Sequence, residues 1–199
     1  MRKRTQSVII IGLMLAAGAV IAVHEFRSAG DLRTQQPQFI VSEGPDAAKL
    51  PSRMTLSSPS FRHNEPIPSA FTCDGANVNP RLAIQNVPPE SVSLALIVDD
   101  PDAVSGTFTH WLVWNMDPAT TAIQEENVPA GAVEGRNGAG KLGYLGPCPP
   151  DKKPHRYFFK IFALDDMLTL EESASKEELE AAIREHLLDK GELIGIYER

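Results

Sequence analysis

Three apolar segments between residues 91 and 164 have the pattern of β-strands. SVSLALIVDD (91–100) is a short apolar run that ends in an acidic turn. HWLVWNM (110–116) and HRYFFKIFAL (155–164) alternate well enough between the two faces of a strand. A closing strand, ELIGIYER (192–199), is predicted after a single late helix. Several strands with one late helix predict a mainly antiparallel β domain.

The predicted helix lies within SKEELEAAIREHLLDKG (175–191) and carries its own start and stop signals. Ser175 and Glu178 have the spacing of a capping box, and Gly191 is typical of the residue beyond a helix end. One face of the helix would gather Leu179, Ala182, Ile183, His186 and Leu187. Sixteen prolines and fourteen glycines also favour strands and shaped loops over a helical bundle.

The first 23 residues are predicted to be an export signal. Arg2, Lys3 and Arg4 precede an uncharged run, VIIIGLMLAAGAVIAV (8–23), as in a signal peptide. This run of sixteen residues is slightly long for a signal peptide and shorter than the roughly 20 residues of a spanning helix. Cleavage and retention as an N-terminal membrane anchor therefore both stay open. Either outcome predicts an exported protein of the periplasm or cell envelope, with membrane contact through residues 8–23 if they are uncleaved.

Residues 24–53 are predicted to be a flexible linker, and residues 54–199 to be the folded domain. The linker contains QQPQ, SEGPD and LPS and shows no sustained helical or strand period.

The formal net charge of −7 argues against nucleic acid as a partner, because a protein that binds a phosphate backbone needs a basic surface. Two cysteines are too few for a disulfide scaffold or a four-cysteine zinc site.

Asp100 and Asp102 form the first of three clusters of reactive side chains. In an extended segment, residues two apart share a face, so both carboxylates could point at one site. Such a pair could share a proton, hold a metal ion or receive an ammonium group. A solvated turn is the alternative, because Asp and Pro are common in turns.

The second candidate site is the single residue His110, at the head of an apolar strand. A histidine in such a place is more often structural than ligand-binding.

The third cluster is GYLGPCPPDKKPHRY (143–157), in which glycines and prolines impose a fixed irregular backbone. Gly146 and the amides after it could form an anion-binding nest. His155 and Tyr157 would share one face of a strand, with Arg156 on the other. A stiff loop with a capping histidine is the alternative interpretation.

No segment carries a complete catalytic motif. The sequence contains no G-x-S-x-G, no phosphate-binding Walker loop, no G-x-G-x-x-G before a helix and no H-E-x-x-H. The spacing of the His and Asp residues does not define a zinc site, and the TCDG around Cys73 resembles a turn more than a thiol nucleophile. The residues therefore predict no catalytic group, metal or cofactor.

Taken together, four segments resemble the bacterial phosphatidylethanolamine-binding proteins, also called Raf kinase inhibitor-like proteins. The segments are TCDGANVNP (72–80), VDDPDAVSGTFTHWLVWNM (98–116), GRNGAGKLGYLGPCPPDKKPHRYFFKIFALD (135–165) and LIGIYER (193–199), in the order of that family. The resemblance covers nearly all of residues 54–199. It implies a fold of two antiparallel β-sheets with a C-terminal helix.

The resemblance also implies a pocket for an anion or a phospholipid head group. Its motifs fall on Asp100, Pro101, Asp102, His110, Gly146, Pro147, His155 and Tyr157. It implies a cis peptide before Pro101 and a structural role for Arg156. DPDAV stands where DPDAP is frequent in the family, so a looser turn is expected. Because two carboxylates would repel phosphate, this lining suits a zwitterionic head group better than a simple anion.

The two cysteines, Cys73 and Cys148, are expected to form a disulfide. Export favours pairing, and each cysteine lies in a motif segment that the family fold would bring to the rim of the pocket. Two free thiols are the alternative.

By resemblance, the expected function is non-catalytic binding of a phosphate-bearing small molecule or phospholipid head group outside the cytoplasm. Two alternatives stay open. One is an inhibitor that acts through its surface on a partner protease or another enzyme. The other is a hydrolase or lyase that uses Asp100 and a pocket histidine.

Overall fold

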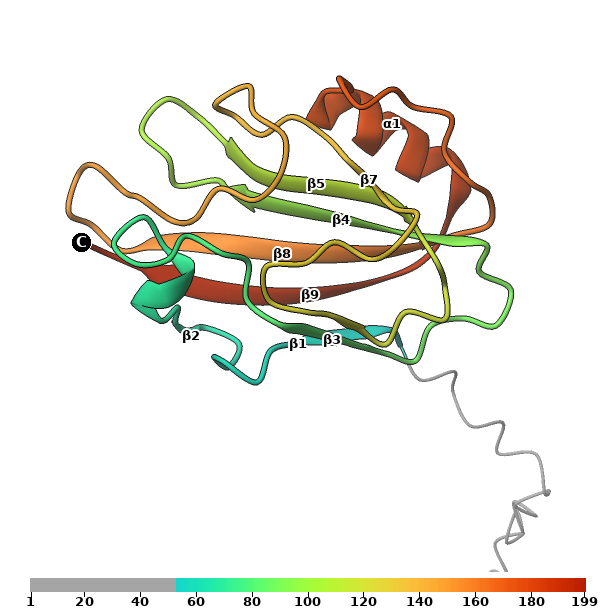
Figure 1. Cartoon of the computed structure of the whole chain (residues 1–199), viewed down its shortest axis with the longest axis horizontal. Helices are drawn as coiled ribbons and strands as arrows, with labels where there is room; N and C mark the ends of the chain where they lie inside the picture. The colour runs from blue at the N-terminus through green and yellow to red at the C-terminus, as the bar shows by residue number, and fades with distance from the viewer. Residues whose placement is uncertain (1–52) are drawn as a thin grey trace, which may run out of the picture. The chain divides into compact units, whose positions relative to one another are not determined.

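Residues 53–199 form two β-sheets and one α-helix in the computed structural model, which describes this part of the chain (Figure 1). The predictions for the export signal and for linker residues 24–52 lie outside the described residues. The strands are β1 (Thr55–Ser57), β2 (Glu65–Pro66), β3 (Leu82–Gln85), β4 (Ser93–Asp100), β5 (Phe108–Met116), β6 (Ala122–Ile123), β7 (Val133–Glu134), β8 (His155–Leu164) and β9 (Leu187–Tyr197). The helices are the short 3-10 helix η1 (Ser69–Phe71) and the α-helix α1 (Lys176–His186).

The larger sheet has six strands in the order β2-β9-β8-β4-β5-β7, and the smaller has three in the order β1-β3-β6. The pairs are antiparallel except for β2 and β9, which run parallel. The expectation of a mainly β fold with two sheets and a C-terminal helix is confirmed. The helix is not the last element, because β9 follows it and runs beside β8 (Figure 1).

The central strand β4 is buried on both faces, which explains its unbroken apolar run. Leu94, Leu96 and Val98 pack in the core that the two sheets share. The alternate residues Ala95 and Ile97 pack in a second core that includes residues of α1. Fully burying one such aliphatic side chain contributes roughly 1.5–3 kcal/mol to folding. The middle of the larger sheet is therefore the most strongly held part of the domain.

The predicted capping box of α1 is present. The Ser175 hydroxyl accepts a hydrogen bond from the Glu178 amide at 3.2 Å, and the Glu178 carboxylate accepts one from the Ser175 amide at 2.7 Å. Leu179 and Ile183 are the buried residues of the helix. No helix within residues 53–199 has the length and apolar character needed to cross a bilayer.

The predicted helix stop at Gly191 is wrong, because α1 ends at His186 and Gly191 lies inside β9 opposite Ile161. The chain passes from helix to strand at Leu187 without a glycine turn. A Cβ atom on Gly191 would lie 2.9 Å from the carbonyl oxygen of Met54. Glycine is required here by the close approach of the chain at the start of β1, which the local sequence pattern does not report.

Cys73 and Cys148 form the expected disulfide and join two segments that lie 75 residues apart. The connection extends to the backbone, where the Cys73 amide donates to the Pro147 carbonyl at 3.1 Å. The segment after η1 is thus fastened to the irregular segment that precedes β8.

We predict that the purified, unreduced protein contains no alkylatable thiol. Mass measurement after alkylation in denaturant checks this, and two labelled cysteines would contradict the bond. Closing a loop of 75 residues restricts the unfolded chain, so the double Cys→Ala variant should lose about 4 kcal/mol of unfolding free energy. Denaturant titration of both proteins measures the difference.

Candidate functional site

A hollow of about 410 Å³ opens where β4 ends and where β5 and β8 begin, and we call it the β8 hollow. The β4–β5 loop and the segment before β8 converge there, at the left of Figure 1. Five of the eight residues expected from the resemblance line it, namely Asp100, His110, Gly146, His155 and Tyr157. The disulfide between Cys73 and Cys148 also lies in its wall.

Asp100 and His155 form a buried pair at the ends of neighbouring strands. Their side chains are 5% and 2% exposed, and Oδ2 of Asp100 lies 2.7 Å from Nδ1 of His155. The other Asp100 oxygen accepts the amide hydrogen of Asp102 at 2.8 Å. Nε2 of His155 lies 3.1 Å from Oδ1 of Asp151. An ionised carboxylate only accepts hydrogen bonds, so this arrangement is fully satisfied when both ring nitrogens carry a proton, and it favours the imidazolium form of His155.

The charged form of His155 is also favoured by its surroundings. Burial alone would lower the pKa of His155, but the hydrogen bond and charge of Asp100, together with those of Asp151, raise it above its usual 6.5. Asp100 and His155 thus bring one negative and one positive charge to the wall of the hollow, and the loop residue Asp151 adds a second negative charge on His155.

His110 enters the hollow through a β-bulge. Val98 pairs with Trp111 and Asp99 with Thr109, so His110 is an extra residue in β5 with no partner on β4. Strict alternation would place His110 with Leu112, which packs in the core beside α1. The bulge instead turns its ring toward the hollow, where it packs against Tyr157 with ring centres 5.1 Å apart.

The His110 ring is held by the backbone of the segment before β8. Its Nδ1 donates to the Leu145 carbonyl, and the Leu145 amide donates back to the His110 carbonyl at 2.9 Å. Burial lowers the pKa of His110, although the Leu145 carbonyl and the charge of Asp100 act in the opposite direction. The neutral ring therefore keeps Nε2 as an acceptor, which becomes a donor only on protonation.

Asp102 does not share the site with Asp100, contrary to the expectation from an extended segment. The chain turns at residues 101–102, and Asp102 points outward to Arg156. Its carboxylate accepts from the Arg156 amide at 3.0 Å and from Nε and an Nη at 2.8 and 2.7 Å. The hydrogen bond to Arg156 is the main cause that lowers the pKa of Asp102 to about 2.

The two predicted prolines do not line the β8 hollow. Pro101 borders a separate shallow depression with Phe158 and Lys160, and Pro147 is buried behind the wall. Every peptide bond within residues 53–199 is trans, so the expected cis peptide before Pro101 is absent.

Gly146 does not form the expected anion nest. Its amide already donates to Oδ1 of Asn77 at 2.8 Å. Of the next four residues, three are prolines without an amide hydrogen. A Cβ atom on Gly146 would lie 2.6 Å from the Phe71 carbonyl oxygen and 2.7 Å from Oδ1 of Asn77. Gly146 therefore lets two segments pack closely, and recognition in the hollow depends on side chains.

Sequence reasoning missed Asp151 and Phe108. Phe108 lines the hollow two residues before His110, and its ring lies 5.0 Å from that imidazole. Asp151 lies four residues before His155 in a proline-rich loop, where spacing alone does not predict contact. Only the folded loop brings its carboxylate to the histidine.

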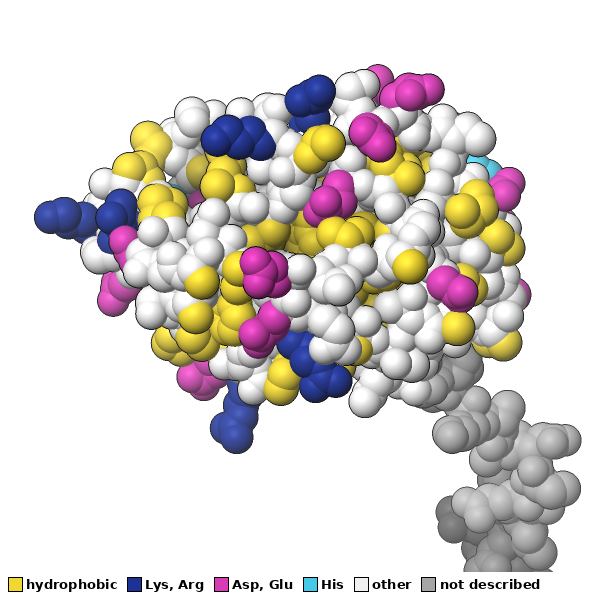
Figure 2. Space-filling model, viewed as in Figure 1, with side chains coloured by type: hydrophobic (Ala, Val, Ile, Leu, Met, Phe, Trp, Pro, Cys, Tyr) yellow, Lys and Arg dark blue, Asp and Glu magenta, His cyan; other side chains and the backbone are white. Residues whose placement is uncertain are grey.

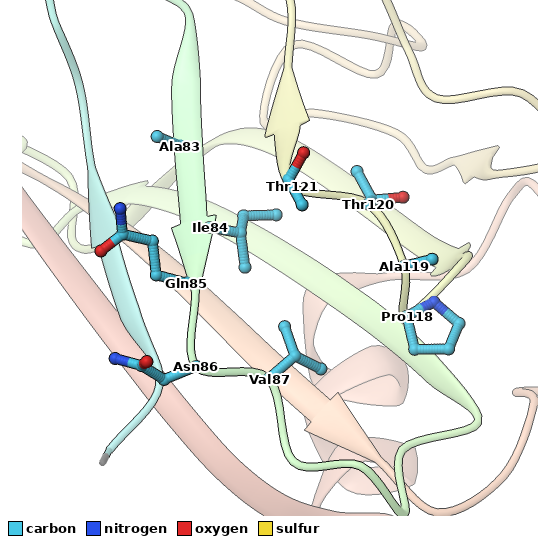
Figure 3. A pocket seen from close by; sticks show the side chains of 9 residues that line it. All are labelled: Ala83, Ile84, Gln85, Asn86, Val87, Pro118, Ala119, Thr120 and Thr121. Carbon is cyan, nitrogen blue, oxygen red and sulfur yellow. The ribbon is translucent and has the colours of Figure 1, made fainter.

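A second hollow of about 410 Å³ lies between β3 and the segment 118–121, and Figure 3 shows its lining. None of its lining side chains is ionisable, so it offers no acid, base or charged partner. Within residues 53–199, no three His, Cys, Asp or Glu side chains are grouped to hold a metal ion. On the face drawn in Figure 2, Lys and Arg side chains are scattered among Asp and Glu. The β8 hollow is therefore the best-supported functional site.

Comparison with known proteins agrees with this fold. A family profile described as phosphatidylethanolamine-binding protein matches residues 57–198. A UPF0098 protein of Methanothermobacter thermautotrophicus is 47% identical over 151 residues, which cover 73% of this chain and 99% of the relative. One from Pyrococcus horikoshii is 45% identical over 155 residues, covering 74% and 78%.

Two solved structures are also similar. A putative phosphatidylethanolamine-binding protein homologue of Chlamydia trachomatis has a TM-score of 0.71 and 41% identity, and covers 74% of this chain and 98% of its own. E. coli YbcL, described as a new member of the mammalian family of these proteins, has a TM-score of 0.70 and 28% identity, with coverage of 74% and 99%.

We predict that the two hollow histidines titrate on opposite sides of pH 6.5, with His155 above and His110 below. NMR titration of the imidazole ring protons measures both. Asp100→Asn should lower the pKa of His155, whereas Asp117→Asn, at the other end of β5, should not. Titration in the reverse order would contradict the geometry.

The raised pKa of His155 also makes the stability of the fold depend on pH. Since the pKa of His155 is raised in the folded state, its contribution to stability is fully present below pH 6.5 and is lost as the pH rises through the folded pKa. Urea titrations at several pH values should show that the unfolding free energy of Asp100→Asn depends less on pH than that of the wild type.

Proposed function

This chain belongs to the phosphatidylethanolamine-binding protein family, and we propose that its β8 hollow binds a phosphate-bearing zwitterion such as a phospholipid head group, without catalysing a reaction. The observation that carries the proposal is the buried Asp100–His155 pair, which lies in one hollow with His110 and Tyr157. This wall offers both signs of charge to a ligand.

The balance of charge supports a zwitterion over a simple anion. Asp100 and His155 line the hollow and Asp151 pairs with His155 from the adjoining loop, so with a charged His155 the three groups carry a net charge of about −1. A lone phosphate would meet this excess negative charge. A ligand that also carries an ammonium group would offset it.

Donors for the phosphate are available on Tyr157 and His110, which also line the hollow. The Tyr157 hydroxyl keeps its proton, because burial and then the charge of Asp100 raise its pKa well above the usual value. Nε2 of His110 adds a second donor once the ring is protonated. The ring packing between His110 and Tyr157 keeps both groups in one place.

Apolar groups at the hollow support a ligand larger than inorganic phosphate. Phe108, Pro149 and Val104 line it, and Val104 is 71% exposed at the point where the family frequently has proline. A volume of about 410 Å³ lies within the usual range of small-molecule sites, roughly 300–1,000 Å³. The glycerol part of a phospholipid head group would contact these side chains.

The hydrogen bonds of the pair support a binding role for Asp100 and His155 rather than a catalytic one. Each oxygen of Asp100 already accepts a hydrogen bond, and both nitrogens of His155 face carboxylates. A general base needs a free acceptor within reach of the proton it removes. In the ligand-free protein, the hydrogen bonds of Asp100 and His155 leave neither group as a ready general base.

We predict that the full-length protein binds glycerophosphoethanolamine, and that Tyr157→Phe weakens binding about two- to tenfold, because one hydrogen bond to the phosphate is lost. Titration calorimetry measures both affinities. Asp117→Asn is the control, since Asp117 is exposed at the other end of β5 from the hollow. Equal affinity for wild type and Tyr157→Phe would refute this binding mode.

The affinity should also rise as the pH falls through the lowered pKa of His110, because protonation adds a donor and a positive charge. A phosphodiester ligand keeps its own charge in this range, so the change reports on the protein. A flat profile in wild type would contradict the role of His110.

We further propose that binding takes place outside the cytoplasm, with residues 1–23 as the export signal. The basic start and uncharged run support this, and a disulfide suits an oxidising compartment. A reporter that is active only after export, fused to residues 1–53, should be active. An inactive reporter with cytoplasmic fusion protein would overturn the proposal.

A further inference from the structure

Asp151 lies in the loop before β8 and reaches back to the histidine that begins the strand. Its Oδ1 is 3.1 Å from Nε2 of His155 and also accepts the Lys153 amide at 3.2 Å. The side chain is 26% exposed, whereas that of His155 is 2% exposed. This loop carboxylate therefore occupies the one ring nitrogen of His155 that Asp100 does not hold.

We propose that Asp151 is the residue by which the β8 hollow distinguishes a zwitterionic head group from a simple anion. The proposal rests on the proposed function and assigns its selectivity to one side chain. In the free protein, Asp151 pairs with His155. On binding, the ligand phosphate takes the place of Asp151 on Nε2 of His155, and the displaced carboxylate pairs with the ligand ammonium group.

The two carboxylates on His155 differ in how firmly they are held. Asp100 is 5% exposed, lies at the end of β4, and uses both oxygens, at 2.7 Å to His155 and 2.8 Å to the Asp102 amide. Asp151 is 26% exposed, lies in a loop next to Lys152 with a φ of 57°, and apart from His155 accepts a backbone hydrogen bond only from its own loop. Asp100 is thus the fixed partner of His155 and Asp151 the movable one.

The selectivity follows from what happens to the displaced carboxylate. With a simple anion, Asp151 loses its partner and stays close to a second negative charge, which opposes binding. Lys153 compensates only weakly, because its Nζ is 3.6 Å from Asp151 and 75% exposed. With a zwitterion, one ion pair is exchanged for two, so every charge keeps a partner. The exchange therefore favours ligands that carry both groups.

Two phosphodiesters that differ in the ammonium group test this on the full-length protein. Glycerophosphoethanolamine carries the ammonium group, and glycerophosphoglycerol replaces it with hydroxyls. Calorimetry should give a preference of about tenfold or more for the zwitterion in wild type, the size expected of one charge-assisted hydrogen bond. In Asp151→Asn, glycerophosphoglycerol should bind several-fold more tightly and the preference should fall close to one.

A second readout separates this role from a structural one. Asp151→Asn should also lower the pKa of His155 in an NMR titration, because one of the two facing carboxylates is removed while Asp100 stays. Asp100, His110 and Tyr157 also surround the ring in this hollow and are unchanged. Asp117→Asn, an exposed carboxylate beyond β5, is the matched control and should leave both the preference and the pKa unchanged.

The outcomes separate the two claims. If wild type and Asp151→Asn bind neither diester, the proposed function fails and the selectivity role fails with it. If wild type binds both diesters and the preference is the same in Asp151→Asn, the head-group function stands and the assignment of Asp151 is overturned.

Discussion

The buried pair of Asp100 and His155 is the interaction on which the rest of the site depends. It joins the last residue of β4 to the first residue of β8 at 2.7 Å, with both side chains almost fully buried. Burying two charges is costly, and removing one partner of such a pair typically costs about 3–5 kcal/mol. The surrounding groups reduce that cost, because Asp102 donates its amide to Asp100 and Asp151 accepts from His155. The geometry of the hollow follows from satisfying this pair.

Three local features bring the remaining groups to the pair. The bulge in β5 turns His110 into the hollow, and the disulfide fastens the segment after η1 to the segment before β8. The absence of a side chain at Gly146 allows these two segments to approach within van der Waals distance. Each feature positions the backbone around the hollow and does not itself provide a group that would contact the ligand. The hollow therefore presents a few polar groups on a rigid support, as a site for binding a small charged molecule requires.

The sequence predicts elements better than it predicts which side chains meet. The strands at 110–116 and 155–164 and the capping box of α1 follow from apolar spacing and local hydrogen-bonding chemistry, and the structure contains them. The direction of His110 could not be predicted, since a bulge shifts strand alternation by one residue. Asp102 was expected beside Asp100 because the segment was read as extended, whereas it turns toward Arg156. Gly191 was expected to end the helix because glycine often follows a helix C-terminus. It is needed instead where the Met54 backbone comes close, and the local pattern does not reveal a contact between such distant residues.

The central claim is that the β8 hollow holds a zwitterionic head group between the two histidines, Tyr157 and the loop carboxylate. A crystal structure of the protein with glycerophosphoethanolamine tests it most directly. The account predicts the phosphate within hydrogen-bonding distance of His110, His155 and Tyr157, and the ammonium group beside Asp151. Ligand density in the hollow between β3 and residues 118–121, with the β8 hollow empty and the Asp151–His155 pair intact, would contradict it.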